Sequence, residues 1–190
     1  MAVGLFGGTF NPVHFGHLIT SQRVKELREL EKIIMMPCNI SPFKVKASDL
    51  LDGKTRIKML ELAVGNNAGY EISDLELRKG GVSYTYDTIM ALKEKHSELD
   101  LIIGFDNLID FDKWYRADDI VKEAKLIVLT RKTDHPDKRN RFFEQAIFVD
   151  SPTVEISSTE IRERIRSGLS IDYLVPRLVV EFIKQEKIYL

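Results

Sequence analysis

Short apolar runs alternate with amphipathic segments along the whole chain, and this alternation limits the fold more than any other feature. The runs are AVGLF (2–6), KIIMM (32–36), LIIG (101–104), LIVL (126–129) and AIFV (146–149). Runs of this length and composition are typical of buried strands. Strands that alternate with helices favour a parallel sheet with right-handed crossovers. We therefore predict an α/β fold, a Rossmann-like doubly wound parallel sheet in a single domain (1–190) with C-terminal helices.

In the segments between these runs, the apolar residues recur at the spacing of a helix. Residues 16–32 and 55–64 place apolar side chains on one helical face and charges on the other. Ser83 is predicted to cap a helix over about 84–95. Residues 70–77 are predicted to be extended. Ligands of such sheets bind at the carboxyl ends of the strands, where the strand order reverses.

Composition excludes several classes of protein. The 190 residues have a formal net charge of −1, which does not indicate a nucleic-acid or membrane surface. Cys38 is the only cysteine, so an internal disulfide and a multi-cysteine zinc site are excluded. The N-terminus lacks the features of a signal peptide, and no apolar run approaches the roughly 18 residues of a membrane span. We expect a cytoplasmic protein, with neither nucleic acid nor membrane among its partners.

The stretch GLFGGTFNPVHFGH (4–17) follows the first predicted strand and opens the first predicted helix. A helix N-terminus attracts anions through its unpaired N–H groups and its dipole. Gly7 and Gly8 would let the backbone approach a phosphate, and Gly16 would keep the space between the histidines open. His14 and His17 can donate hydrogen bonds to phosphate oxygens. The alternative is that both histidines pack against polar neighbours at the helix start.

Familiar glycine and metal motifs do not fit this chain. The next glycine after Gly8 is Gly16, so the dinucleotide fingerprint G-x-G-x-x-G is absent. Gly53-Lys54-Thr55 matches the end of a phosphate loop, but Ser48 stands where that motif requires glycine. No third ligand cluster accompanies the two histidines, which argues against zinc. We predict no protein metal site.

A second anion site is predicted near the other end, in VEISSTEIRERIRSG (154–168). Ser157 and Glu160 have the spacing of a capping box, and capping alone would explain these two residues. Ser158 and Thr159 add hydroxyls in the first turn, and Arg162 adds a forked cation one turn later. Two helix N-termini of this kind suit a polyphosphate better than a single anion.

Together, GGTFNPVHFGH and ISSTEIR resemble the early [HT]-x-G-H and late I-S-S-T-x-x-[RK] motifs of the nucleotidylyltransferase superfamily. Further segments narrow the resemblance to the bacterial nicotinate-nucleotide adenylyltransferases over essentially the whole chain: SYTYDT (83–88), IIGFDNL (102–108), KWY (113–115) and DYLVPRLVVEFIKQEKIYL (172–190). The resemblance implies that nicotinate mononucleotide and ATP give nicotinate adenine dinucleotide and pyrophosphate, a step of NAD biosynthesis. In PCNISPFK, Cys38 and Phe43 replace the family's asparagine and histidine.

The implied reaction is an in-line transfer in which an already ionised phosphate attacks the α-phosphorus of ATP. Catalysis then needs positioning and charge stabilisation rather than a general base. His14 and His17 are the predicted catalytic residues, and Mg²⁺ is expected to arrive with ATP. The predicted ATP contacts are Gly7, Gly8, Thr9, Phe10, Gly16, Ser157, Ser158, Thr159 and Arg162.

The resemblance also implies a site for nicotinate mononucleotide. Trp114 would stack on the nicotinate ring with Tyr115 beside it, although a lone tryptophan more often belongs to the core. Backbone N–H groups of Thr85 and Tyr115 would bind the ring carboxylate and favour acid over amide. The remaining predicted contacts are Lys44, Asp106, which could instead cap a helix, and Arg131.

Three other functions share parts of this pattern. Phosphopantetheine adenylyltransferase has both phosphate motifs, but the SYT and WY segments and the longer chain argue against it. A class I aminoacyl-tRNA synthetase would need more than 190 residues for its tRNA-binding parts. A non-catalytic nucleotide-binding regulatory protein could have the same fold. Pairing of subunits through the C-terminal apolar stretch is left open.

Overall fold

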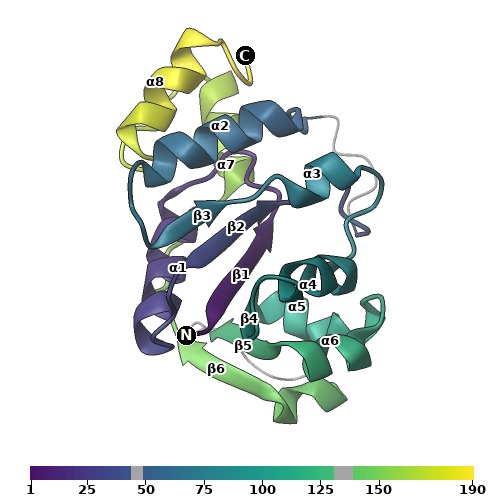
Figure 1. Cartoon of the computed structure of the whole chain (residues 1–190). Coiled ribbons are helices and arrows are strands. Elements are labelled where there is room, and N and C mark those ends of the chain that lie inside the picture. The colour runs from purple at the N-terminus through teal and green to yellow at the C-terminus, as the bar shows by residue number, and fades with distance from the viewer. Residues whose placement is uncertain (44–48, 131–138) are drawn as a thin grey trace.

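The computed structural model describes residues 1–43, 49–130 and 139–190. Six parallel strands form one sheet in the order β3-β2-β1-β4-β5-β6, as Figure 1 shows. The strands are β1 (Val3–Gly8), β2 (Ile33–Pro37), β3 (Tyr70–Ile72), β4 (Leu99–Gly104), β5 (Lys125–Thr130) and β6 (Ala146–Asp150). The prediction of a doubly wound parallel sheet is confirmed.

Side chains of the central strands alternate between two apolar cores, one on each face of the sheet. In β1, Val3 and Leu5 belong to one core and Phe6 to the other. In β2, Ile34 and Met36 share the core of Val3. This period-two alternation follows from strand geometry, and burial on both faces explains why the sequence of each strand is almost uniformly apolar.

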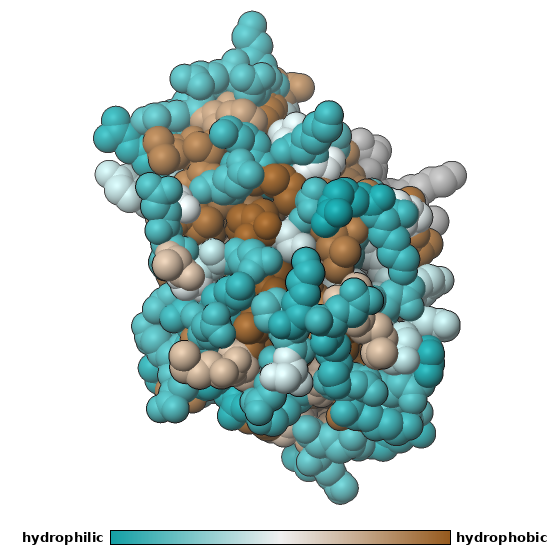
Figure 2. Space-filling view, in the orientation of Figure 1, coloured by the Kyte–Doolittle hydropathy of each residue, from teal (hydrophilic) through white to brown (hydrophobic). Residues whose placement is uncertain are grey.

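Helices cover both faces of the sheet. One core contains residues of α1 (Phe15–Leu27), α2 (Gly53–Val64), α7 (Ser158–Arg166) and α8 (Arg177–Gln185). The other core contains residues of α4 (Thr85–Lys93), α5 (Phe105–Ile109) and α6 (Ala117–Glu123). The short elements are α3 (Leu75–Lys79), η1 (Phe111–Lys113) and η2 (Arg141–Glu144). On the face shown in Figure 2, hydrophobic side chains appear between covering helices and hydrophilic ones occupy most of the remaining surface.

The strand order reverses between β1 and β4. From β1 the chain continues outward to β2 and β3, and it then returns to place β4 on the opposite side of β1. In open α/β sheets the ligand crevice lies outside the carboxyl ends of the strands at this point. The loops after Gly8 and Gly104 therefore define where a site is expected.

Two local predictions are wrong. The extended conformation of 70–77 ends at Ile72, and Leu75–Lys79 is the helix α3. Its residues are good helix formers, and Gly80, at φ 70°, ends it. Ser83 does not cap α4, because Tyr84 is the N-cap residue and the Ser83 hydroxyl instead accepts a hydrogen bond from the Asn39 N–H at 2.8 Å.

Across the described ranges, no helix is both long enough and apolar enough to cross a membrane.

Candidate active site

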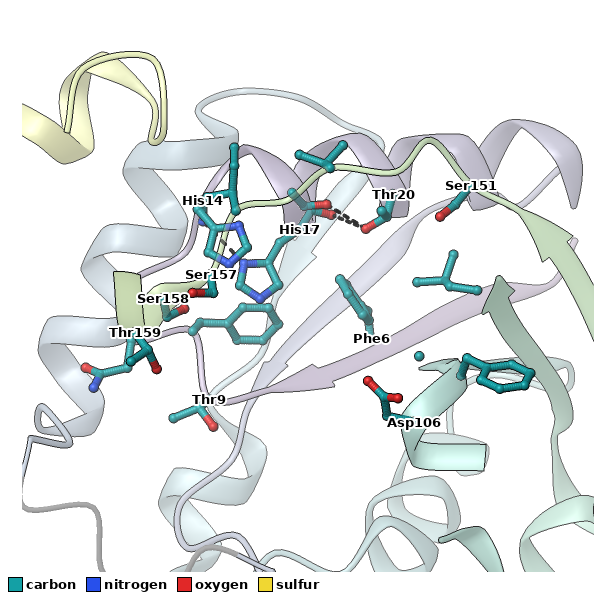
Figure 3. A pocket seen from close by; sticks show the side chains of 18 of the residues that line it. Phe6, Thr9, His14, His17, Thr20, Asp106, Ser151, Ser157, Ser158 and Thr159 are labelled. Carbon is teal, nitrogen blue, oxygen red and sulfur yellow. Dashed lines mark hydrogen bonds between the residues drawn. The ribbon is translucent and has the colours of Figure 1, made fainter. Parts of the chain in front are cut away.

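A cleft of about 450 Å³ opens at the carboxyl end of the sheet. Its walls come from the β1–α1 loop, the first turns of α1 and α7, the start of α5 and the segment after β6. Figure 3 shows the two imidazoles side by side, the hydroxyls of 157–159 near them, and the Asp106 carboxylate on the opposite side. We call this the first cleft. It is lined by Phe6, Thr9, Phe10, Asn11, His14, Gly16, His17, Thr20, Gly104, Phe105, Asp106, Leu129, Ser151, Pro152, Val154, Ile156, Ser157, Ser158, Thr159 and Arg162.

The two histidines stack at the start of α1. His14 is the N-cap residue, and its ring centroid lies 3.7 Å from that of His17. The backbone N–H of His14 donates to Nδ1 of His17 at 3.3 Å. Since a backbone N–H can only donate, Nδ1 of His17 carries no proton. Neutral His17 therefore has its proton on Nε2, which makes that nitrogen the donor of the ring.

Both imidazoles are neutral at pH 7. Burial lowers the pKa of His14 from 6.5 to about 4. Burial, and secondarily the charge on His14, lower the pKa of His17 well below 6.5. A neutral imidazole can still donate one hydrogen bond, so each ring can contact a phosphate oxygen without carrying a charge.

We expect the depressed pKa of His14 to make the protein less stable in mild acid. The unfolded chain binds this proton near pH 6.5 but the folded chain only near pH 4, so the stabilisation is complete above 6.5 and is lost as the pH falls. The loss from His14 should be about 2 kcal/mol between pH 8 and pH 5. Urea unfolding should show a smaller loss in His14→Gln than in the wild type or in the control His96→Gln. Equal losses in all three would contradict this assignment.

The absence of a Cβ at Gly8 makes room for an aromatic ring. A Cβ on Gly8 would lie 2.9 Å from Cζ of Phe10, which is 1% exposed and has a φ of 48°. The Phe10 ring in turn meets His17 edge-on, with centroids 5.0 Å apart. A Cβ on Gly7 would meet nothing within 4 Å. Gly8 therefore allows the Phe10 ring to pack against His17. At Gly7, the space that a Cβ would occupy is open.

The first turn of α7 presents two kinds of donor. Ser157 caps the helix, because its hydroxyl oxygen accepts from the Glu160 N–H at 3.1 Å, which confirms the predicted cap. The Ser158 hydroxyl donates to the Pro12 carbonyl at 2.8 Å and so fastens α7 to the loop before α1. The Ser158 and Thr159 N–H groups occupy helix positions that have no intrahelical acceptor. Backbone N–H groups and the Ser157 and Thr159 hydroxyls are thus the donors available to an anion.

Arg162 lies one turn further along α7 and also holds the β1–α1 loop. Its Nη1 donates to the Asn11 carbonyl at 2.9 Å, and its Nη2 donates to Oγ1 of Thr159 at 3.3 Å. Tyr189, near the C-terminus, donates to Oδ1 of Asn11 at 2.9 Å. The loop that carries the histidines is therefore braced by α7 and by the C-terminal segment.

A second cleft, of about 350 Å³, lies beside the first. Trp114 and Tyr115 follow η1, and Thr85 occupies the first position of α4. The Trp114 ring packs at 5.0 Å between centroids on Phe111, and Tyr115 lies 4.7 Å from Tyr84. Residues lining this second cleft are Leu5, Phe6, Gly7, Gly8, Thr9, Cys38, Ser41, Pro42, Phe43, Glu76, Ser83, Tyr84, Thr85, Leu101, Ile102, Ile103, Gly104, Asn107, Asp110, Trp114 and Tyr115.

The two clefts meet at the point where the strand order reverses. Phe6, Thr9 and Gly104 line both of them. Phe6 belongs to β1, Thr9 follows β1, and Gly104 ends β4. Two ligands bound in the clefts would therefore approach each other above the carboxyl ends of β1 and β4.

The structure gathers most of the predicted site residues in these two clefts. Asp106, predicted to contact the mononucleotide, lines the first cleft, whereas Gly7, predicted to contact ATP, lines only the second, as does Gly8. Lys44 and Arg131 lie outside the described residues.

Sequence reasoning missed several residues that line the clefts. Glu76 faces the second cleft from α3, in a segment that was predicted to be extended, and burial raises its pKa. Asn11 holds the loop through its carbonyl and its side chain. Asn11 stands within the glycine–histidine stretch, but its residue type alone gave no signal of this bracing.

Relatives of a known family align with this chain over its full length. Residues 5–164 match the cytidylyltransferase-like family. The probable nicotinate-nucleotide adenylyltransferase of Hydrogenobaculum sp. (strain Y04AAS1) is 44% identical over 190 residues, covering 100% of this chain and 98% of that protein. The probable nicotinate-nucleotide adenylyltransferase of Caldicellulosiruptor bescii is 37% identical over 196 residues, covering 100% and 99%.

Solved structures show the same fold. The nicotinic acid mononucleotide adenylyltransferase of Plasmodium falciparum complexed with NaAD superposes with a TM-score of 0.81 at 20% identity, covering 99% of this chain and 97% of that one. The same enzyme complexed with APC superposes with a TM-score of 0.79 at 19% identity, covering 99% and 96%. From the sequence relatives, this chain belongs to the cytidylyltransferase-like family and, within it, to the nicotinate-nucleotide adenylyltransferases.

Proposed function

We propose that this chain, acting as one 190-residue unit, transfers the adenylyl group of ATP to nicotinate mononucleotide and releases pyrophosphate. The observation that carries this proposal is the pair of clefts that share Phe6, Thr9 and Gly104. A transfer between two nucleotides needs two binding sites whose reacting groups meet. The family supports the same reaction, since its relatives carry that name.

ATP fits the first cleft better than the second. The N-termini of α1 and α7 face it with imidazoles, hydroxyls and unpaired N–H groups, which suit a triphosphate. Leu129, Val154 and Ile156 form an apolar part of the same cleft. A flat adenine ring can be buried against such side chains. The adenine ring and the triphosphate of ATP would thus share one continuous site.

In the proposed reaction, a 5′-phosphate oxygen of the mononucleotide attacks the α-phosphorus of ATP. The bond between that phosphorus and the bridging oxygen to the β-phosphorus breaks, and pyrophosphate leaves with its electron pair. The attacking phosphate is ionised at neutral pH, so no protein base is needed. His17 donates from Nε2 to oxygens on the α-phosphate, and the donors of α7 hold the departing phosphates.

Mg²⁺ is proposed to enter with the triphosphate. Within residues 1–43, 49–130 and 139–190, no three metal-ligating side chains converge. Among the described residues that line the first cleft, Asp106 is the one carboxylate. One carboxylate suits an ion that keeps its waters and takes phosphate oxygens as ligands. The metal would add positive charge to the phosphates, while the chain positions them.

Nicotinate mononucleotide is proposed to occupy the second cleft. Trp114 offers a face for the pyridine ring, and the first turn of α4 at Thr85 offers N–H groups for its carboxylate. An amide would bring its own NH₂ donors towards these donors and would leave some unpaired. We therefore propose that the second cleft selects the acid over the amide.

Pyrophosphate release from ATP, measured with each acceptor, tests the function. We expect kcat/KM to be at least about 10²-fold higher with nicotinate mononucleotide than with nicotinamide mononucleotide. Phosphopantetheine should give no release above background. Comparable values for acid and amide would contradict the specificity, and release only with phosphopantetheine would overturn the function. No release with any acceptor would favour a regulatory protein.

A further inference from the structure

Arg56, which the reaction above does not use, is a buried residue that is bonded to residues of both clefts. It lies in α2 and is 1% exposed. Within the described part of the chain, its guanidinium donates to three backbone carbonyls, those of Leu51 at 3.0 Å, Thr9 at 3.0 Å and Cys38 at 2.8 Å. Thr9 belongs to the connection after β1, while Cys38 and Leu51 lie near the two ends of the connection between β2 and α2.

One nitrogen of Arg56 joins the ends of two neighbouring strands. The β1–β2 ladder ends with the pair Gly8 and Pro37, and the Cys38 N–H still donates to the Gly8 carbonyl at 2.9 Å. Just beyond, Nη1 donates to both the Thr9 and the Cys38 carbonyls. The guanidinium thus continues the ladder at the point where the strands lead into cleft-forming loops.

The connection continues from the Cys38 carbonyl to α4. That carbonyl belongs to the same peptide unit as the Asn39 N–H, which donates to Oγ of Ser83 at 2.8 Å. The Ser83 N–H in turn donates to the Ile40 carbonyl at 2.9 Å. Ser83 directly precedes Tyr84, the N-cap residue of α4. Arg56 is therefore linked to Thr9, which lines both clefts, and to the helix start that lines the second.

Arginine is a costly residue at a buried position. Burial lowers the pKa of the Arg56 guanidinium, and apolar side chains of similar volume often serve stability as well as a buried cation does. The guanidinium, however, offers five N–H groups in a fixed planar fork, whereas lysine offers a single rotating ammonium. Two nitrogens of this fork are used here, since Nε donates to the Leu51 carbonyl while Nη1 donates to those of Thr9 and Cys38.

We propose that Arg56 is a positioning residue that fixes the two clefts relative to each other, and so sets the approach of the attacking phosphate to the α-phosphorus. The inference rests on the proposed function, because it assumes that the clefts hold the two reactants. A residue with this role affects the encounter of the reactants more than the binding of either one.

Arg56→Lys tests this role, with Arg28→Lys as the matched control. Arg28 donates from Nε to the buried Asp100 carboxylate at 2.9 Å, and Asp100 lies near the start of β4, at the opposite end of the sheet. We expect Arg56→Lys to lower kcat by about tenfold or more at saturation. The Kd of ATP by calorimetry and that of the mononucleotide by Trp114 fluorescence should each change by less than about threefold. Trp114 is the sole tryptophan, so its signal reports the second cleft.

In Arg28→Lys, we expect a lower unfolding temperature with kcat within about twofold of the wild type. The proposal is overturned if folded Arg56→Lys keeps the wild-type kcat, or if it weakens the binding of one substrate without slowing turnover. Wild-type acceptor use is measured first and tests the proposed function by itself. The Arg56 comparison is then made with whichever acceptor is used.

Ser83→Ala replaces Arg56→Lys if the latter does not fold by circular dichroism. It removes the hydrogen bond from the Asn39 N–H to the Ser83 hydroxyl, at a half-buried position, and keeps the backbone bond from the Ser83 N–H to the Ile40 carbonyl. Loss of one such bond should lower kcat by about threefold. The control variant Ser73→Ala should leave kcat unchanged. An unchanged kcat in Ser83→Ala would overturn the proposal in that case.

Discussion

Replacing His17 by alanine should lower kcat by about 10²-fold or more while changing the affinity for ATP much less. The reason is the direction of its one available donor. Nδ1 of His17 is occupied by the His14 N–H, so the neutral ring presents the Nε2 proton to the cleft. A donor fixed in this way stabilises charge that grows on the α-phosphate in the transition state, and it needs no reorganisation at that moment.

The ring is fixed by its neighbours as well as by that hydrogen bond. His14 stacks on one side of it and Phe10 meets it edge-on, with centroids at 3.7 Å and 5.0 Å. His17→Gln should recover part of the activity, because a glutamine amide can place an N–H near the position of Nε2. His96→Ala, outside both clefts, should remain within about twofold of the wild type. A loss below tenfold in His17→Ala would contradict the catalytic assignment.

The sheet could be predicted from sequence because its strands are buried on both faces. Such strands form continuous apolar runs, and all five predicted runs correspond to strands of the sheet. The short β3 was predicted only as part of a longer extended segment. Of the segment predicted to be extended, Tyr70–Ile72 is the strand β3, but Leu75 and Leu77 lie in α3. The helix-forming residues of 75–79 and Gly80 after them explain this difference.

The candidate site could be predicted as far as its motifs extend. His14 and His17 and the start of α7 carry chemistry in their own side chains, and the structure brings them into one cleft. Ser83 was misassigned because a cap and a hydroxyl that binds a distant loop have the same local sequence. Arg56 gave no signal at all, because its three acceptors are backbone carbonyls that can belong to any residue type. Contacts of this kind depend on tertiary structure alone.

Gly16→Ala should remove most of the activity without unfolding the protein. A Cβ at this position would lie 2.9 Å from both Cε1 and Nδ1 of His14, closer than such atoms pack. The His14 ring cannot easily yield, because His17 is stacked against it at 3.7 Å. A shift of the pair by a few tenths of an ångström to 1 Å should lower kcat by about 10²-fold. Alanine favours a helix over glycine, so the unfolding temperature should stay within a few degrees of the wild type.

A double variant identifies the cause of that loss. If the clash with His14 is responsible, the variant with both His14→Ala and Gly16→Ala should be no slower than His14→Ala alone, because the smaller side chain leaves room for the new methyl group. If the methyl group instead blocks the triphosphate directly, the two losses should multiply. Multiplying losses would contradict a role through His14 and would assign Gly16 to the close approach of a phosphate to the start of α1. Steady-state rates for the wild type, both single variants and the double variant distinguish these outcomes, since coupled neighbours deviate from additivity and independent ones do not.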